Sequence, residues 1–297
     1  VMCSPESSSR LASEYKKLNL ITKTPAPNWT DNPVLVDKFI KTLADTNEIA
    51  YLHFLGGETL LVPAFKKILN KLIECKINDR CSVGFTTNLT VYDQETIDIL
   101  AKFKQINVGL SIECLHPVNE YIRLGCDFSK TQEMLDRWVN ETKKHANFIT
   151  QLRITPTILS VLYLDTVYEY AYSNRISIES CNFVRRPKYF RPSVLPLKYK
   201  QTVIQKLLHW IDSKPEKTVS EKIINSRDPH NAKIWAVQEA KSYVNYFRTV
   251  PDDSDCLKDL VQYLMLLESS RKNCILDYLP EYENLFRSIE YRKQSDN

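Results

Sequence analysis

Short apolar runs alternate with amphipathic segments along most of the chain. Five runs have the length and composition of strands, and each is followed by a segment with the apolar spacing of a helix. The predicted strands lie at 49–57, 81–88, 106–113, 147–157 and 176–184. The predicted helices that follow them lie at 63–76, 93–104, 129–145, 164–174 and 197–212. This order indicates parallel strands joined by helical crossovers, as in an α/β sheet or barrel.

Several predicted strands carry apolar side chains on one face and small or polar side chains on the other. A strand buried on both faces would be apolar throughout, and a closed eight-stranded barrel fills its interior with bulky branched residues. The small or polar positions are Ser82, Gly84, Thr86 and Asn88; Asn107, Gly109, Ser111 and Glu113; and Gln151, Arg153 and Thr155. We therefore expect an open or wide barrel whose interior holds a polar ligand.

The pattern changes after about residue 215, where helical segments follow one another without a clear strand between them. These segments lie near 219–226, 231–247, 256–269 and 282–290. We therefore expect two parts, a barrel in residues 1–215 and a helical C-terminal extension in residues 216–297.

Composition and charge exclude several classes of protein. Hydrophobic residues make up 43% of the chain and charged residues 26%, which is ordinary for a globular protein. The net charge is +4 and the basic residues are dispersed, so we expect no nucleic-acid partner. No apolar run reaches the roughly 18 residues of a membrane helix, and no signal peptide is recognisable. The eight cysteines include no CxxC pair. This cysteine pattern favours reduced thiols in a cytoplasmic protein. Because no long apolar run is present, we expect no membrane partner.

Two of the five glycines are adjacent and end the first predicted strand. Gly56 and Gly57 permit unusual backbone angles and a close approach of a ligand, and Glu58 adds an acceptor for a cationic group. A tight turn with a solvent-facing glutamate would by itself explain the triplet. The spacings of a dinucleotide site, GxGxxG, and of a phosphate loop, GxxxxGK[ST], are absent.

Polar residues also end the next two predicted strands. Asn88 ends the second strand, and Ser111 and Glu113 end the third. Ligand sites in parallel βα folds gather at the C-terminal ends of strands. Arg123 follows ten residues after Glu113 and could hold a carboxylate through two hydrogen bonds, the alternative being a surface ion pair.

Taken together, these residues resemble the radical S-adenosylmethionine (SAM) enzymes. The resemblance rests on a strand ending in GGE and followed by TLL, a strand ending in TN, a strand ending in SIE, and a downstream YIR. The opening VMC resembles the end of the C-x3-C-x2-C cluster motif. The following SPESSS and the closing stretch LESSRKNCILDYLPEYENLF are similar to the twitch/SPASM-like branch of the superfamily.

The resemblance implies a fold, two cofactors and a first set of binding residues. The implied fold is α/β, a partial (β/α)6 TIM-like barrel of parallel strands whose first strand is missing. The implied cofactors are a 4Fe-4S cluster and SAM. Cys3 resembles the third cluster ligand, and clusters of this type are held by cysteine thiolates. Met2 and Val184 resemble residues that flank the adenine.

Further binding residues follow from the same resemblance. The segment Gly56–Glu58 resembles the one that receives the ammonium of the methionine part of SAM. Asn88 and Ser111 resemble polar positions near the ribose and the methionine. Glu113 stands where aspartate is commoner, and Arg123 resembles the basic residue that meets the carboxylate. The sequence TNL departs from the more usual TNG, so the turn after Asn88 is expected to differ.

The resemblance also implies a reaction. The reduced cluster would cleave SAM to a 5′-deoxyadenosyl radical, which would abstract hydrogen from a substrate. The twitch/SPASM-like resemblance suggests a peptide as that substrate. An electron donor such as flavodoxin or ferredoxin would be a partner. No side chain is assigned as catalytic, because the cofactor performs the difficult step while the protein positions it and excludes water.

The sequence departs from the family at its start, where only the last of the three cluster cysteines is present. We expect Val1 to be a truncation point, with C-x3-C upstream in a longer parent and with this chain inactive by itself. The alternative is a degenerate, non-catalytic barrel that binds SAM or a partner protein. An unrelated hydrolase or aldolase barrel lacks support, because GxSxG, HExxH and a suitably placed Schiff-base lysine are absent.

Overall fold

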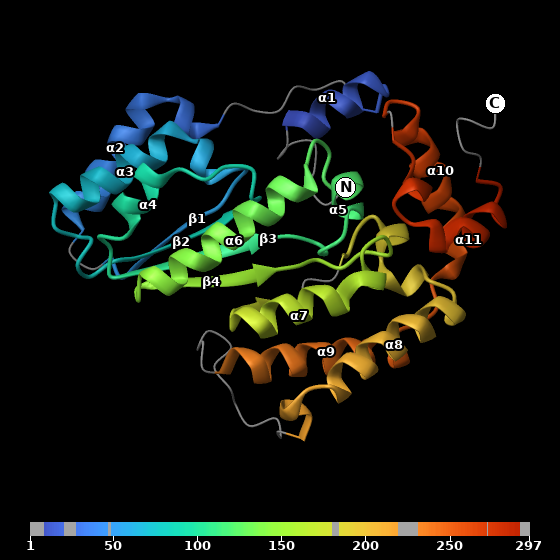
Figure 1. The fold of residues 1–297 in the computed structure, drawn as a ribbon. Helices are drawn as coiled ribbons and strands as arrows, with labels where there is room; N and C mark the ends of the chain where they lie inside the picture. The colour runs from blue at the N-terminus through green and yellow to red at the C-terminus, as the bar shows by residue number, and fades with distance from the viewer. Residues whose placement is uncertain are drawn as a thin grey trace.

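The computed structural model describes residues 9–20, 28–46, 49–179, 184–218, 231–271 and 273–291. Its centre is one parallel sheet with the strand order β1-β2-β3-β4-β5 (Figure 1). The strands are β1 (Tyr51–Phe54), β2 (Ser82–Thr87), β3 (Gln105–Ser111), β4 (Phe148–Arg153) and β5 (Ser177–Glu179). Each strand pairs with the next one along the chain, so the sequence order is also the spatial order.

Helices connect these strands and continue beyond them. They are α1 (Ser9–Lys17), α2 (Pro33–Asp45), α3 (Pro63–Glu74), α4 (Gln94–Leu100), α5 (Val118–Ile122), α6 (Phe128–Lys144), α7 (Leu164–Asn174), α8 (Leu197–Asp212), α9 (Ala232–Thr249), α10 (Leu257–Glu268) and α11 (Glu283–Arg287). Local signals start two of them. The Asn32 side chain caps α2, whose first residue is a proline, and Asp127 accepts a hydrogen bond from the Lys130 amide at the start of α6.

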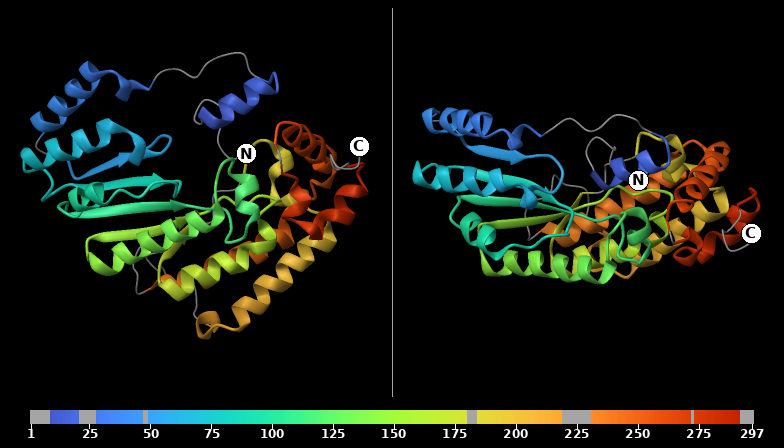
Figure 2. Two further views of the ribbon diagram at one scale, coloured as in Figure 1. Left: turned by 45° about the horizontal axis from the view of Figure 1, so that its top comes forward. Right: turned by 90° about the horizontal axis from the view of Figure 1, so that it is seen from above.

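One face of the sheet is apolar and is covered by α3, α4 and α6 (Figure 2). Phe85 of β2 contacts the ring of Phe65 from α3 and the ring of Trp138 from α6, with centroids 5.5 and 5.8 Å apart. All three side chains are buried. Each large side chain removed from water in this way stabilises the fold by about 1.5–3 kcal/mol. The amphipathic helices and the apolar strand face together build this core.

The opposite face of the sheet is small and polar, as the alternation predicts. Strand register aligns its side chains in rows across the sheet. One row contains His53, Gly84 and Asn107, and a row nearer the strand ends contains Ser111, Arg153 and Glu179. Because successive side chains alternate between faces, this polar surface is a direct result of the sequence pattern.

The first of the C-terminal helices, α9, packs against β5, the last strand of the sheet. Helix α9 contacts β5, α7 and α8, and Trp235 donates its indole N–H to the Ile178 carbonyl over 2.7 Å. Figure 2 shows α10 and α11 lying beyond the C-terminal ends of the strands. The expected α/β fold of parallel strands with a helical C-terminal part is therefore confirmed.

Two further points concern the division into domains and the presence of membrane-spanning helices. The division into residues 1–215 and 216–297 stays a prediction, and the helix expected near 219–226 lies outside the described residues. Within the part of the chain that the structure describes, no helix combines the length and the apolar character needed to cross a bilayer.

Candidate functional site

Glu58 lies where the C-terminal ends of β1 and β2 meet. Its Oε2 accepts hydrogen bonds from the Asn88 amide at 2.7 Å and from the Thr87 hydroxyl at 3.1 Å. Its Oε1 accepts a bond from the Leu60 amide at 3.3 Å, which caps the short 3-10 turn Thr59–Leu61. The side chain is buried rather than solvent-facing. Glu58 thus fastens the turn after β1 to the end of β2.

The environment of Glu58 acts on its charge in opposing directions. Burial raises the pKa of the carboxyl above its ordinary value, while the hydrogen bonds from Asn88, Leu60 and Thr87 partly offset the increase. Arg123 adds a smaller electrostatic contribution that also lowers this pKa. The two residues therefore interact through space across the strand ends, although they are far apart in sequence.

Gly56 and Gly57 leave the backbone accessible beside Glu58. Both residues are exposed. Gly56 has a φ of 156°, and a Cβ added there would meet no atom within 4 Å. A ligand can approach this backbone closely, because neither glycine has a side chain in the way.

Glu113 and Arg123 form an ion pair beyond the end of β3. Arg123 Nη2 donates to Glu113 Oε1 at 2.7 Å, and Arg123 Nε donates to Oε2. The Glu113 side chain is 3% exposed and that of Arg123 is 23% exposed. Arg123 directly follows α5, and Ser111, half-buried, ends β3. The structure therefore brings Glu113 and Arg123 into direct contact, and Ser111 lies two residues before Glu113 at the end of β3.

The turn after Asn88 differs from a TNG turn in its third residue. Leu89 has a φ of 64°, a left-handed conformation that favours glycine. The Leu89 side chain is buried, and its amide donates to the Thr87 hydroxyl at 3.1 Å. Packing and this bond hold leucine in a conformation that glycine adopts more easily. Asn88 itself uses its side-chain oxygen to accept bonds from the Thr90 amide and hydroxyl.

A polar contact that the sequence could not locate crosses the small and polar face of the sheet, here called the inner face. Arg153 of β4 extends over Gly109 of β3, where a Cβ would lie 2.7 Å from Arg153 Cδ. Its Nη1 donates to the Thr86 hydroxyl on β2 at 3.3 Å, and its Nε lies 3.5 Å from Glu179 on β5. That Nε is buried and makes no hydrogen bond within the part of the chain that the structure describes. The sequence assigned Arg153 to the polar face, but only the register shows which strands it joins.

The remaining predicted residues lie at the edges of the described chain or outside it. Val184 is half-buried and packs against the hydrophobic core. Met2 and Cys3 lie outside the described residues. Within the described ranges, no group of three or more His, Cys, Asp or Glu side chains could hold a metal ion. The described part of the chain thus contains the predicted SAM-binding residues from Gly56 to Val184, whereas the predicted cluster ligand lies outside it.

Comparisons with known proteins identify the family of the chain. A scan against protein-family models matches residues 8–155 to the radical SAM superfamily. No curated protein matches the chain. Among solved structures, SuiB of Streptococcus suis, crystallised with S-adenosylmethionine, is similar at 18% sequence identity and a TM-score of 0.41.

The alignment with SuiB covers 60% of this chain and 39% of SuiB, so this chain spans well under half of that protein. The likeness is too distant to transfer any property of SuiB. The family match covers about half of the chain, including all of β1–β4 and the predicted residues from Gly56 to Arg123. The chain therefore carries a radical SAM domain and belongs to the radical SAM superfamily.

Proposed function

We propose that this chain forms the SAM-binding core of a radical SAM enzyme. The observation that carries the proposal is the meeting of Gly56–Glu58, Asn88, Ser111 and the Glu113–Arg123 pair at the C-terminal ends of neighbouring parallel strands. When bound, the cluster and SAM together supply a radical that abstracts a hydrogen atom from a substrate. The protein's own residues bind, orient and shield these groups.

The contacts within the chain support different roles for Glu58 and for the glycines that precede it. Its two oxygens already accept bonds from Leu60, Thr87 and Asn88, so we assign it the positioning of the strand ends. The accessible backbone of Gly56 and Gly57 would receive the methionine ammonium. The partly buried negative charge of Glu58 would favour a cation at this place.

Arg123 would meet the SAM carboxylate from the other side. Its pairing with Glu113 fixes the plane of the guanidinium, which reduces the entropy lost when a second anion binds. Ser111 and Asn88 would contact the ribose and methionine, and Val184 and Met2 would flank the adenine. Cys3 would be one cluster ligand, served by a small electron-transfer protein such as flavodoxin or ferredoxin.

The polar inner face of the sheet is the proposed substrate surface. Arg153 and Glu179 lie in one row with Ser111, and their side chains are 31% and 39% exposed. Opposite charges held side by side suit a substrate with both a carboxylate and an amino or amide group. A peptide has both, which supports the peptide substrate suggested by the twitch/SPASM-like resemblance.

Anaerobic cluster reconstitution of the protein expressed from its full reading frame tests the function. We expect a brown protein that cleaves SAM to 5′-deoxyadenosine. Cys3→Ala should abolish both iron–sulfur absorbance and cleavage. Cys75→Ala is the matched control, because Cys75 is a half-buried free thiol at the end of α3 and should change neither property.

Two outcomes would contradict the proposal. Full cleavage activity in Cys3→Ala would show that Cys3 is not a cluster ligand. SAM binding without an iron–sulfur cluster and without cleavage would favour the alternative, a barrel that binds SAM or a partner without radical chemistry.

A further inference from the structure

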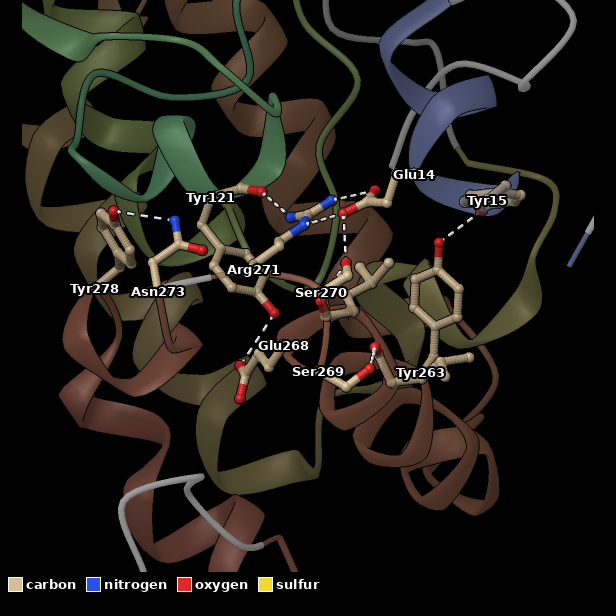
Figure 3. A network of polar contacts seen from close by, with 12 residues as sticks. Glu14, Tyr15, Tyr121, Tyr263, Glu268, Ser269, Ser270, Arg271, Asn273 and Tyr278 are labelled. Atoms are coloured by element: carbon tan, nitrogen blue, oxygen red, sulfur yellow. Dashed lines mark hydrogen bonds and ion pairs between the residues drawn. The ribbon is translucent and has the colours of Figure 1, made fainter. Parts of the chain in front are cut away.

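A buried ion pair joins α1 to the segment that follows α10 (Figure 3). Arg271 Nε donates to Glu14 Oε1 at 2.6 Å, and Arg271 Nη2 donates to Oε2 at 2.9 Å. The two side chains are 3% and 5% exposed, respectively. Beside the pair, the hydroxyls of Tyr15 and Tyr263 lie 2.6 Å apart. Helix α1 is thus held by a buried ion pair to the segment that follows α10 and by a half-buried tyrosine pair to α10 itself.

The same arginine also holds α5. Arg271 Nη1 donates to the Tyr121 carbonyl at 2.9 Å, two residues before Arg123. The buried Tyr121 hydroxyl donates to Glu268 Oε1 at 3.1 Å. Figure 3 shows Tyr121 between the guanidinium of Arg271 and the carboxylate of Glu268. The backbone and the side chain of one α5 residue are therefore both fixed by the end of α10.

Glu268 is itself held in place by several donors. The Tyr291 hydroxyl donates to its Oε2 at 2.6 Å, and the Ile275 amide donates to Oε1 at 2.8 Å. The Glu268 side chain is buried, so these bonds replace the water that a carboxylate would otherwise require. The support for Tyr121 is consequently built from residues close to the C-terminus.

A third contact closes the arrangement. Arg10 of α1 donates through Nη1 to the Gly125 carbonyl at 3.0 Å and to the Leu124 carbonyl at 3.3 Å. These carbonyls directly follow Arg123. Helix α1 therefore contacts both residues 118–125, here called the α5 loop, and the segment after α10. These two segments also contact each other. A shift of any one of the three would break a polar contact.

This arrangement fixes helix α1 relative to the α5 loop, which carries Arg123 of the proposed SAM site. We infer that Arg271 is a positioning residue that holds α1 and Arg123 relative to each other. This inference rests on the proposed function.

Burial of an ion pair is a weak source of stability but a strong constraint on geometry. A well-packed apolar replacement is often as stable as a buried pair, whereas the pair demands one arrangement of its partners. The planar guanidinium of Arg271 meets three acceptor atoms at once, two on Glu14 and one on Tyr121. Lysine cannot reproduce this geometry.

The test compares Arg271→Met with Lys200→Met. Lys200 is also a buried cation, with a side chain 5% exposed and Nζ 3.1 Å from Asp252, but it lies on α8 away from α1 and α5. The cluster-loaded protein from the full reading frame is measured by urea unfolding, hydrogen–deuterium exchange and equilibrium dialysis with SAM. Arg271→Lys, which keeps the charge, serves as the conservative variant.

We expect both methionine variants to lower the urea midpoint. Only Arg271→Met should speed exchange in residues 9–17 and 118–125 and weaken SAM binding by about tenfold or more, as loss of supporting contacts around a metal site does. Arg271→Lys should restore part of the affinity. Unchanged exchange in these two segments, or equal weakening of SAM binding by Lys200→Met, would overturn the inference.

The exchange measurement separates this inference from the proposed function. If the wild-type protein binds no SAM, the proposed function fails, and exchange alone decides whether Arg271 couples α1 to α5. Loss of protection in both segments would then support the coupling, and unchanged protection would refute it.

Discussion

Arg123 and Glu113 form a two-point ion pair that spans the turn between β3 and α5. The sequence presents them as two separate candidates for contact with SAM. The structure shows a single unit in which a nearly inaccessible carboxylate orients a partly exposed guanidinium. Any anion that approaches Arg123 therefore meets a side chain whose orientation is already fixed.

Removing the arginine should destabilise the protein more than neutralising the glutamate. Arg123→Met leaves the buried Glu113 carboxylate without its charged partner, and we expect a loss of about 3 kcal/mol in the free energy of unfolding. Glu113→Gln keeps an acceptor for the guanidinium, and we expect a loss of about 1 kcal/mol. Urea unfolding at neutral pH measures both. The reverse order would mean that the pair is not held as the structure describes.

Glu58 should give the protein a pH-dependent component of stability. Burial raises the pKa of Glu58 above its ordinary 4.5, so the folded state binds this proton more tightly than the unfolded state. Its contribution to stability is therefore fully present below the unfolded pKa and is lost as pH rises through the folded pKa.

The non-titrating variant Glu58→Gln isolates this effect. Between about pH 4 and pH 7, wild type should lose stability relative to Glu58→Gln as pH rises. Urea midpoints of both proteins over this range provide the measurement. A constant difference between the two proteins would show that the Glu58 pKa is the same in the folded and unfolded states.

Gly109 should tolerate a methyl group less well than Gly84, although both lie on the inner face. In Gly109→Ala, the Cβ would lie 2.7 Å from Arg153 Cδ and 2.9 Å from the Thr86 hydroxyl, so their hydrogen bond must break. We expect a loss of about 1–3 kcal/mol. In Gly84→Ala the nearest atoms are the Tyr51 hydroxyl at 2.0 Å and His53 Nδ1 at 2.6 Å. Both lie at the far ends of side chains that can turn outward, since Tyr51 is exposed and His53 is half-buried. Equal losses in thermal or urea unfolding would contradict this account.

Replacing Trp138 by phenylalanine should lower the free energy of unfolding only slightly. Its ring packs against Phe85 and Tyr92, but its buried indole N–H has no hydrogen-bond partner among the described residues. Trp138→Phe removes the unsatisfied donor along with some packing, so we expect a loss below about 1.5 kcal/mol. Trp138→Ala leaves a large cavity and should lose about 3–5 kcal/mol. Similar losses in the two variants would indicate that the N–H is satisfied in solution.

Five short apolar runs were sufficient to predict the five strands of the described sheet, and alternation of apolar and polar residues in three of them predicted its polar face. In β3, for example, Ile106, Val108 and Leu110 are buried against helices, while Asn107 and Ser111 are half-buried on the other face. Burial on one face leaves a period of two in the sequence, and this period is visible without a structure. The same reasoning located the polar interior.

Contacts between distant segments could not be predicted in this way. The pairing of Arg153 with Thr86 and Glu179 depends on strand register, which a single sequence does not specify. Likewise, the proposed solvent-facing alternative for Glu58 is excluded only by the burial of that side chain. The departure of TNL from TNG was visible in the sequence, but the left-handed conformation of Leu89 and its burial were not.

The separation between Glu14 and Arg271 has a consequence for the order in which the molecule is completed. The two residues are 257 positions apart in a chain of 297. At roughly 5–20 residues per second, Glu14 leaves the ribosome on the order of tens of seconds before its partner is made. Helix α1 is thus synthesised well before the residue that holds it, and it can reach its final place only after that residue has been made.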